Sequence, residues 1–212
     1  MRQKGEKTDK TRSKILAAAE RLFVRYGFQK TTIGDICHDG RISRQTYYRY
    51  FPDKEELLVG YIVDQTTEFI SRYEREAARR ESAVDRIRLL VFEYEELSRS
   101  SPVMRMLYDL RSDVLWRWSQ RPESRDQMRQ ILDAFSGVIK QGIEAGEFPP
   151  CNIEWTAYLI YQFLNGAFFV TPSLYPDIIA RREEAFSGEV ISFVLKSLLH
   201  APLEPQGGYA RE

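Results

Sequence analysis

The sequence predicts an all-α fold in which three N-terminal helices lead into a bundle of longer helices, about nine helices in all. Apolar residues recur at the 3.6-residue period of a helix through almost every segment. Ser, Thr, Asp or Asn residues stand before these periodic segments, and Gly or Pro residues follow several of them. No segment alternates as a half-buried strand does, and 212 residues with 43% hydrophobic content are enough to bury a core.

Three short helices are predicted before residue 53, each bounded by local signals. The first carries apolar residues at helical spacing over 15–26, and Gly27 is placed to end it. The second begins at Thr32 with a T-x-x-D capping pattern. The third begins at Ser43 and ends at Pro52, because proline cannot continue the helical hydrogen-bond ladder.

Longer helices are predicted through the rest of the chain. Asp53 caps one that reaches about residue 80, and a last helix spans about 181–199. Between them, three helices begin near Ser82, Ser101 and Asn152, and another follows Pro122. This organisation predicts an N-terminal unit of residues 1–53 with a basic arm, a helical domain of residues 54–200 and a flexible tail of residues 201–212.

The net charge of zero conceals an asymmetry along the chain. Residues 1–50 hold 12 Lys and Arg against 5 Asp and Glu, a net charge of +7, whereas residues 51–212 hold 19 against 26, a net charge of −7. A basic N-terminal unit favours a nucleic-acid partner, although a solvated charged arm has the same composition.

Composition and motifs argue against several classes of protein. The chain has two distant cysteines, Cys37 and Cys151, and no apolar leader segment, so a reducing cytoplasm is expected. No apolar run is long enough to span a membrane, and no membrane association is expected. No nucleotide-binding, hydrolase or zinc-protease motif is present, so we expect no enzymatic activity, no metal and no cofactor.

The second and third predicted helices form a helix-turn-helix plan, in which the second helix of the pair enters the DNA major groove. Arg44 and Gln45 lie in the first turn of that helix, and these residue types pair with guanine and adenine edges. Hydroxyls and cations nearby suit phosphate oxygens, whereas Tyr47 and Phe51 are expected to anchor the helix in the core. The candidate DNA-contacting residues are Thr32, Arg41, Arg44, Gln45, Thr46, Tyr48, Arg49, Tyr50 and Lys54.

The stretch TTIGDICHDGRISRQTYYRYFPDKEELL, residues 31–58, resembles the DNA-binding module of the TetR/AcrR family of transcriptional regulators. The resemblance covers about residues 10–58. One position departs from the family pattern, which has glycine two residues before Ser43, where this chain has Arg41. Three alternatives follow: Arg41 is strained, the turn differs locally, or Gly40 takes the glycine role. Arg41 is either an additional phosphate contact or a solvent-exposed arginine.

The resemblance implies a ligand-responsive regulator, by family default a repressor, that binds a pseudo-palindromic operator in double-stranded DNA as a homodimer. A small apolar or aromatic effector would release it. Two rivals stay open: a co-regulator of the same fold that acts through a protein partner, and a ligand carrier or enzyme built on the helical body.

The C-terminal helices carry the candidate dimer interface. Residues 155–170 are apolar nearly all round, and the last helix adds a second apolar face, so two such helices from each protomer would make a two-fold interface. The alternative is that both helices are core. The candidate interface residues are Phe163, Ala167, Val190, Ile191, Val194 and Leu198.

The candidate effector site lies among the aromatic residues of the helical domain, because binding cavities are mostly apolar with a few polar groups. Core packing or surface exposure is the alternative for each residue. The candidates are Tyr94, Tyr108, Trp116, Phe135, Trp155, Tyr158, Gln162 and Asn165.

Overall fold

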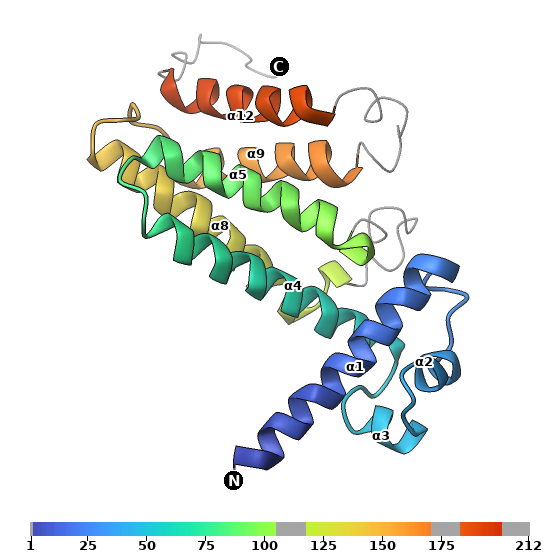
Figure 1. Ribbon diagram of the computed structural model, residues 1–212. Coiled ribbons are helices and arrows are strands. Elements are labelled where there is room, and N and C mark those ends of the chain that lie inside the picture. The colour runs from blue at the N-terminus through green and yellow to red at the C-terminus, as the bar shows by residue number, and fades with distance from the viewer. Residues whose placement is uncertain (1, 105–117, 171–182, 201–212) are drawn as a thin grey trace, which may run out of the picture.

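The computed structural model describes residues 2–104, 118–170 and 183–200, and this part of the chain is all-α (Figure 1). It contains eight α-helices and one π-helical turn and no strand. The predicted fold class is therefore confirmed. None of the helices described is both long and apolar enough to cross a membrane.

The first three helices form a small unit at one end of the molecule (Figure 1). They are α1 (Arg2–Tyr26), α2 (Ile33–Asp39) and α3 (Arg44–Tyr48). Gly27 ends α1 as predicted, with a φ of 82° in the left-handed region that glycine adopts at little cost. Tyr47 is completely buried, so α3 is fixed to the other two helices by its inner face.

The remaining helices form a bundle that α4 (Lys54–Ala77) joins to the N-terminal unit (Figure 1). α8 (Pro122–Glu144) is central to it and packs against α4, α5 (Ala83–Ser100) and α9 (Ile153–Asn165). α12 (Glu183–Leu199) packs against α5. Figure 1 places α12 at the edge of the bundle away from α3.

Five predicted helix starts are confirmed together with their caps, because each cap is a local interaction, and α8 starts at Pro122 without a side-chain cap bond. A side-chain oxygen accepts a hydrogen bond from a backbone amide in the first turn of the helix. Thr32 forms the predicted capping box with Asp35. The other caps that bond in this way are Ser43, Asp53, Ser82 and Asn152.

Three predicted helices differ from the structure. The first is not short, because α1 begins at Arg2 and runs for 25 residues. The segment 155–170 is not one α-helix, because α9 ends at Asn165 and continues as the π-helical turn η1 (Gly166–Val170). The Ser98 hydroxyl donates to the Phe168 carbonyl at 2.6 Å, which ties this wider turn to α5. α4 ends at Ala77, before the predicted residue 80. The tail of residues 201–212 and most of the helix predicted after Ser101 lie outside the described residues.

Candidate nucleic-acid interface and internal cavity

The helix α3 presents one buried face and one exposed face. On the inner face, the Tyr47 hydroxyl donates to the Asp53 carbonyl at 2.9 Å, and the Tyr47 and Phe51 rings lie 6.1 Å apart between centroids. Both residues are core anchors, as the sequence predicts. The outward-facing side chains are exposed polar or aromatic groups: Arg44, Gln45, Tyr48 and Arg49.

The turn between α2 and α3 resolves the alternatives for the missing glycine. Arg41 has a φ of 52°, in the left-handed region, whereas Gly40 has an ordinary right-handed φ of −75°. The Arg41 amide donates to the His38 carbonyl at 3.2 Å, and the Ile42 amide donates to the Cys37 carbonyl at 3.0 Å. These two bonds form the Schellman motif that commonly ends a helix, with arginine at the position that usually holds glycine. Arg41 is therefore strained, and the turn itself is regular.

Packing explains why position 40 holds glycine, since the right-handed φ there is open to any residue. A Cβ at Gly40 would lie 3.1 Å from the Ile36 carbonyl oxygen and 3.4 Å from the Ala18 Cβ of α1. Gly34 is a similar case, because a Cβ there would lie 3.0 Å from a terminal guanidinium nitrogen of Arg44. The exposed Arg44 side chain thus rests over the first turn of α2, where glycine leaves room for it.

Two other predicted DNA-contacting residues, Thr32 and Thr46, have internal partners. The Thr32 hydroxyl donates to Asp35 at 2.6 Å, and the Thr46 hydroxyl lies 2.9 Å from that of Ser43. The Thr32 hydrogen bonds lower the pKa of Asp35, the side-chain bond contributing most. These hydroxyls support the helix starts from which the longer side chains project.

Lys54 is the first residue of α4, at the helix N-terminus where it was predicted, and its ammonium has internal partners. Its ammonium donates to the carbonyls of Phe28 at 2.6 Å and Thr31 at 2.7 Å, and it lies 4.4 Å from the Phe28 ring centroid. Burial lowers its pKa. Lys54 therefore fixes the α1–α2 loop to the start of α4. Of the remaining candidates, Arg41 is exposed and Tyr50 is half-buried.

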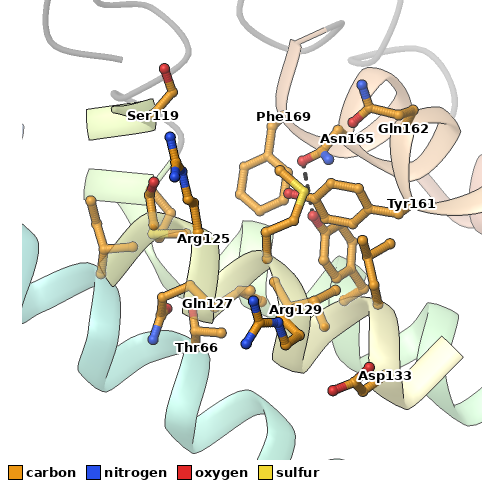
Figure 2. Close-up of a pocket in the computed structure, with 18 of the residues that line it drawn as sticks. Thr66, Ser119, Arg125, Gln127, Arg129, Asp133, Tyr161, Gln162, Asn165 and Phe169 are labelled. Carbon is orange, nitrogen blue, oxygen red and sulfur yellow. Dashed lines mark hydrogen bonds between the residues drawn. The ribbon is translucent and has the colours of Figure 1, made fainter. Parts of the chain in front are cut away.

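A cavity of about 980 Å³ opens within the helical bundle, separate from α3 (Figure 2). Figure 2 shows α8 side chains on one side of it and side chains of α9 and η1 on the other. Its wall is mainly apolar, formed by residues such as Ile62, Leu97, Met128, Ile131 and Phe169. The volume suits a small organic ligand.

The structure brings together only some of the predicted effector residues. Tyr94, Gln162 and Asn165 line the cavity. The predictions for Trp155 and Tyr158 are corrected, because both side chains are exposed and neither lines the cavity. Phe135 also does not line it, since it packs behind Tyr94 with ring centroids 6.5 Å apart. Tyr108 and Trp116 lie outside the described residues.

Some polar groups of the cavity wall are hydrogen-bonded to one another, and one buried side-chain oxygen is not. The Tyr94 hydroxyl donates to Asn165 Oδ1 at 2.9 Å, and burial raises the pKa of neighbouring Tyr161. Gln127 of α8 is only 6% exposed, and its Oε1 has no hydrogen-bond partner among the described residues. Gln127 is not among the predicted cavity residues, although it lies four residues before Ile131 on the apolar stripe of α8.

The predicted dimer-interface residues are largely buried within the protomer. Val194 is 1% exposed, so it has no surface to give to a second chain. The same correction applies to Ala167, Val190 and Leu198, whereas Phe163 and Ile191 are half-buried. The exposed apolar side chains of α9 and α12 are instead Trp155, Leu159, Phe193 and Leu199.

No group of three or more potential metal-ligating side chains occurs in the described part of the chain. The structure thus offers two candidate sites: the exposed face of α3 and a separate, mainly apolar cavity in the helical bundle.

The comparisons with known proteins agree with this arrangement. Residues 15–60 match the family model for bacterial regulatory proteins of the tetR family. The chain is 29% identical over 164 residues to the uncharacterized HTH-type transcriptional regulator YfiR of Bacillus subtilis, covering 76% of this chain and 78% of that one. It is 22% identical to the fatty acid metabolism regulator protein of Bacillus subtilis, covering 63% of this chain and 68% of that one.

A solved structure has the same fold over nearly the whole chain. It is the transcriptional regulator FadR from Bacillus subtilis in complex with stearoyl-CoA, with a TM-score of 0.69, 18% identity and coverage of 88% of this chain and 97% of that one. The family match falls on the segment that forms α1 to α3, where the exposed face of α3 lies. Over residues 15–60 the chain thus carries the DNA-binding module of the TetR family, and the relatives that it resembles over most of its length are transcriptional regulators.

Proposed function

We propose that the protein is a homodimeric repressor that binds a pseudo-palindromic operator through α3 and is released by an apolar effector. The observation that carries the proposal is the division of α3 into a buried anchor, Tyr47, and exposed side chains that begin with Arg44 and Gln45. In this proposal residues 1–53 bind DNA, residues 54–200 bind the effector and dimerise, and residues 201–212 are a tail.

Each exposed residue of α3 has a role that its chemistry suits. Arg44 and Gln45, in the first turn, read base edges in the major groove. Tyr48 and Arg49 contact phosphates and fix the register of the helix on the duplex. Arg41, Thr46 and Tyr50 lie in the same unit and supply further phosphate contacts. Thr32 supports them by capping α2, because its hydroxyl proton is donated to Asp35.

An apolar surface on α9 and α12 supports the homodimer. Trp155, Leu159 and Phe163 are spaced four residues apart on α9 and thus share a face. The Phe163 ring stacks on that of Phe193 of α12, with centroids 4.5 Å apart and an interplanar angle of 30°. Leu159 and Phe193 are both exposed, and a two-fold partner would cover them.

A long-chain fatty acyl-CoA is the first effector class to examine. The cavity is large and mainly apolar, which suits an acyl chain. Arg125 and Arg129 of α8 line it, and these cations suit the anionic groups of coenzyme A. A relative of the same fold has been solved in complex with stearoyl-CoA.

The DNA-binding part of the proposal is tested by selecting duplexes from a random pool on the purified protein at about 50 and about 200 mM salt. We expect enrichment of a pseudo-palindrome with half-sites one helical turn apart, bound more weakly at the higher salt. Arg44→Ala should then weaken binding by about tenfold or more and relax the base preference at one position of each half-site. A pool without enrichment at either salt would contradict operator binding by the free protein.

The effector part is tested by fluorescence anisotropy of the selected duplex titrated with stearoyl-CoA. Release of DNA by stearoyl-CoA, but not by coenzyme A alone, is the expected result, because the acyl chain supplies the apolar contact. Met128→Glu, which puts a charge into the cavity wall, should abolish the response without weakening operator binding. Equal operator affinity with and without stearoyl-CoA would exclude this effector class.

A further inference from the structure

A continuous series of bonds runs from the cavity wall toward the DNA-binding unit. Ser124 lines the cavity in the first turn of α8, and its hydroxyl donates to the Arg121 carbonyl at 2.8 Å. The Arg121 guanidinium donates to Glu56 of α4. Arg121 Nε also lies 3.5 Å from Glu123, which holds the guanidinium between two carboxylates. The cavity wall is therefore joined to the first turn of α4.

The series continues from α4 into α3. The Glu56 amide donates to the Asp53 carboxylate at 2.7 Å, so the residue that receives Arg121 also takes part in the cap of α4. The Asp53 carbonyl in turn accepts the Tyr47 hydroxyl at 2.9 Å. Tyr47 is the buried anchor of α3, so its neighbours Arg44 and Tyr48 move with it.

We infer that this series of five residues, which we call the Ser124–Tyr47 chain, couples occupancy of the cavity to the orientation of α3. The Glu56–Arg121 ion pair is the link between the helical bundle and the DNA-binding unit. The inference rests on the proposed function, since it specifies how an effector would reach the DNA-binding helix. The Ser124–Tyr47 chain consists of Ser124, Arg121, Glu56, Asp53 and Tyr47.

The Glu56–Arg121 ion pair would transmit a small displacement of α8 to the first turn of α4. Arg121 precedes Pro122 at the start of α8 and makes no side-chain cap bond to its own helix, so its guanidinium is committed to Glu56 and Glu123. Ser124, Gln127 and Met128 line the cavity on the next turns of the same helix. A ligand that contacts these turns shifts the backbone that carries Arg121.

Gln127 of α8 lines the cavity close to this link, and its buried Oε1 has no hydrogen-bond partner among the described residues. A polar group of a ligand can donate a hydrogen bond to this oxygen, which gives the ligand a direct contact with the turn of α8 that follows Arg121.

The test measures operator affinity of the ligand-free protein in a double-mutant cycle. Arg121→Gln and Glu56→Gln should each weaken binding by about five- to tenfold, and the double variant should be no weaker than either single variant. The matched control is Arg79→Gln, which removes an ion pair with Glu76 at the other end of α4, 3.0 Å long, and should leave operator affinity unchanged. Both link variants should also lose most of the stearoyl-CoA response.

Additive effects of the two substitutions, unchanged affinity in either, or an equal loss in Arg79→Gln would overturn the inference. Hydrogen exchange of the amides in residues 44–57 supplies a readout that needs neither DNA nor effector. Exchange there should accelerate in Arg121→Gln and not in Arg79→Gln, and equal exchange in the two variants would also overturn it. Failure of the proposed function would instead appear as absence of operator binding by the unsubstituted protein.

Discussion

Arg41 holds a backbone conformation that its side chain disfavours. A φ of 52° brings the Cβ of any L-residue other than glycine close to the following carbonyl, at a cost of about 1–2 kcal/mol. Arg41→Gly should therefore raise the free energy of unfolding by about 1 kcal/mol, measured by urea denaturation. The control is Arg49→Gly, which has a right-handed φ of −74° and should lower the stability. A loss of stability in Arg41→Gly would mean that the arginine side chain contributes more than the strain costs.

Some of the roles of individual residues could be predicted from the sequence, and others could not. The nature of Tyr47 and Phe51 as anchors was predictable, because their spacing places them on one face of a short helix whose other positions are polar. The partners of Lys54 were not, because they are carbonyls of a loop more than twenty residues away in the chain. The position of Gln127 on the apolar stripe of α8 indicates burial, but its polar side chain is typical of an exposed residue, so its place in the cavity wall was not predicted.

Among the helices, α8 offers a matched pair of glycines. A Cβ at Gly142 would lie 2.1 Å from Phe148, a buried ring in the turn after α8, whereas a Cβ at Gly137 would have nothing within 4 Å. Gly137→Ala should raise the thermal midpoint, because alanine is favoured over glycine in a helix by about 1 kcal/mol. Gly142→Ala gains the same propensity but forces the Phe148 ring to move, so it should destabilise the protein by about 1–3 kcal/mol. Similar thermal midpoints for the two variants would contradict this packing of α8 against the turn.

Helix starts were predictable because a cap involves residues three apart, as in the bond that the Trp155 backbone amide donates to the Asn152 side-chain Oδ1. The buried face of α12 was not predictable, since Phe193 and Val194 are adjacent and equally apolar in sequence, yet only Val194 is buried. That choice depends on the packing of α12 against α5, a contact between distant segments. The same reason explains why Trp155 and Tyr158 were assigned to the cavity although they face outward.

For the whole molecule, Glu147 connects the turn after α8 to the start of α5 and makes stability depend on pH. Its carboxylate accepts hydrogen bonds from the Ser82 hydroxyl at 2.6 Å and the Ala83 amide at 2.9 Å. The Ser82 bond is the main reason that the pKa of Glu147 lies below its ordinary value of 4.5. Because the folded-state pKa is lowered, this contribution is complete above about pH 4.5 and is lost as the pH falls through the folded-state value.

Urea midpoints measured from neutral pH downward test this linkage. The stability difference between the unsubstituted protein and Glu147→Gln should stay constant above about pH 4.5 and shrink at lower pH. Ser82→Ala should reduce the pH-dependent part, because it removes the largest cause of the lowered pKa. A difference that stays constant down to the lowest pH would exclude a specific role for the carboxylate.

The proposed dimer links the apolar surface at one end of the molecule to DNA binding at the other. Phe193 is 58% exposed on α12, and Phe92 is 55% exposed on α5, so the two phenylalanines are matched in exposure but not in location. Phe193→Glu should yield a monomer in sedimentation equilibrium, because a charge would be buried at the two-fold interface. Phe92→Glu should leave the dimer intact. The monomer carries one α3 instead of two, so it should bind only a half-site, with about half the dependence of log affinity on log salt concentration. A Phe193→Glu variant that remains dimeric would place the subunit interface elsewhere, whereas a monomer with an unchanged salt dependence would separate DNA binding from dimerisation.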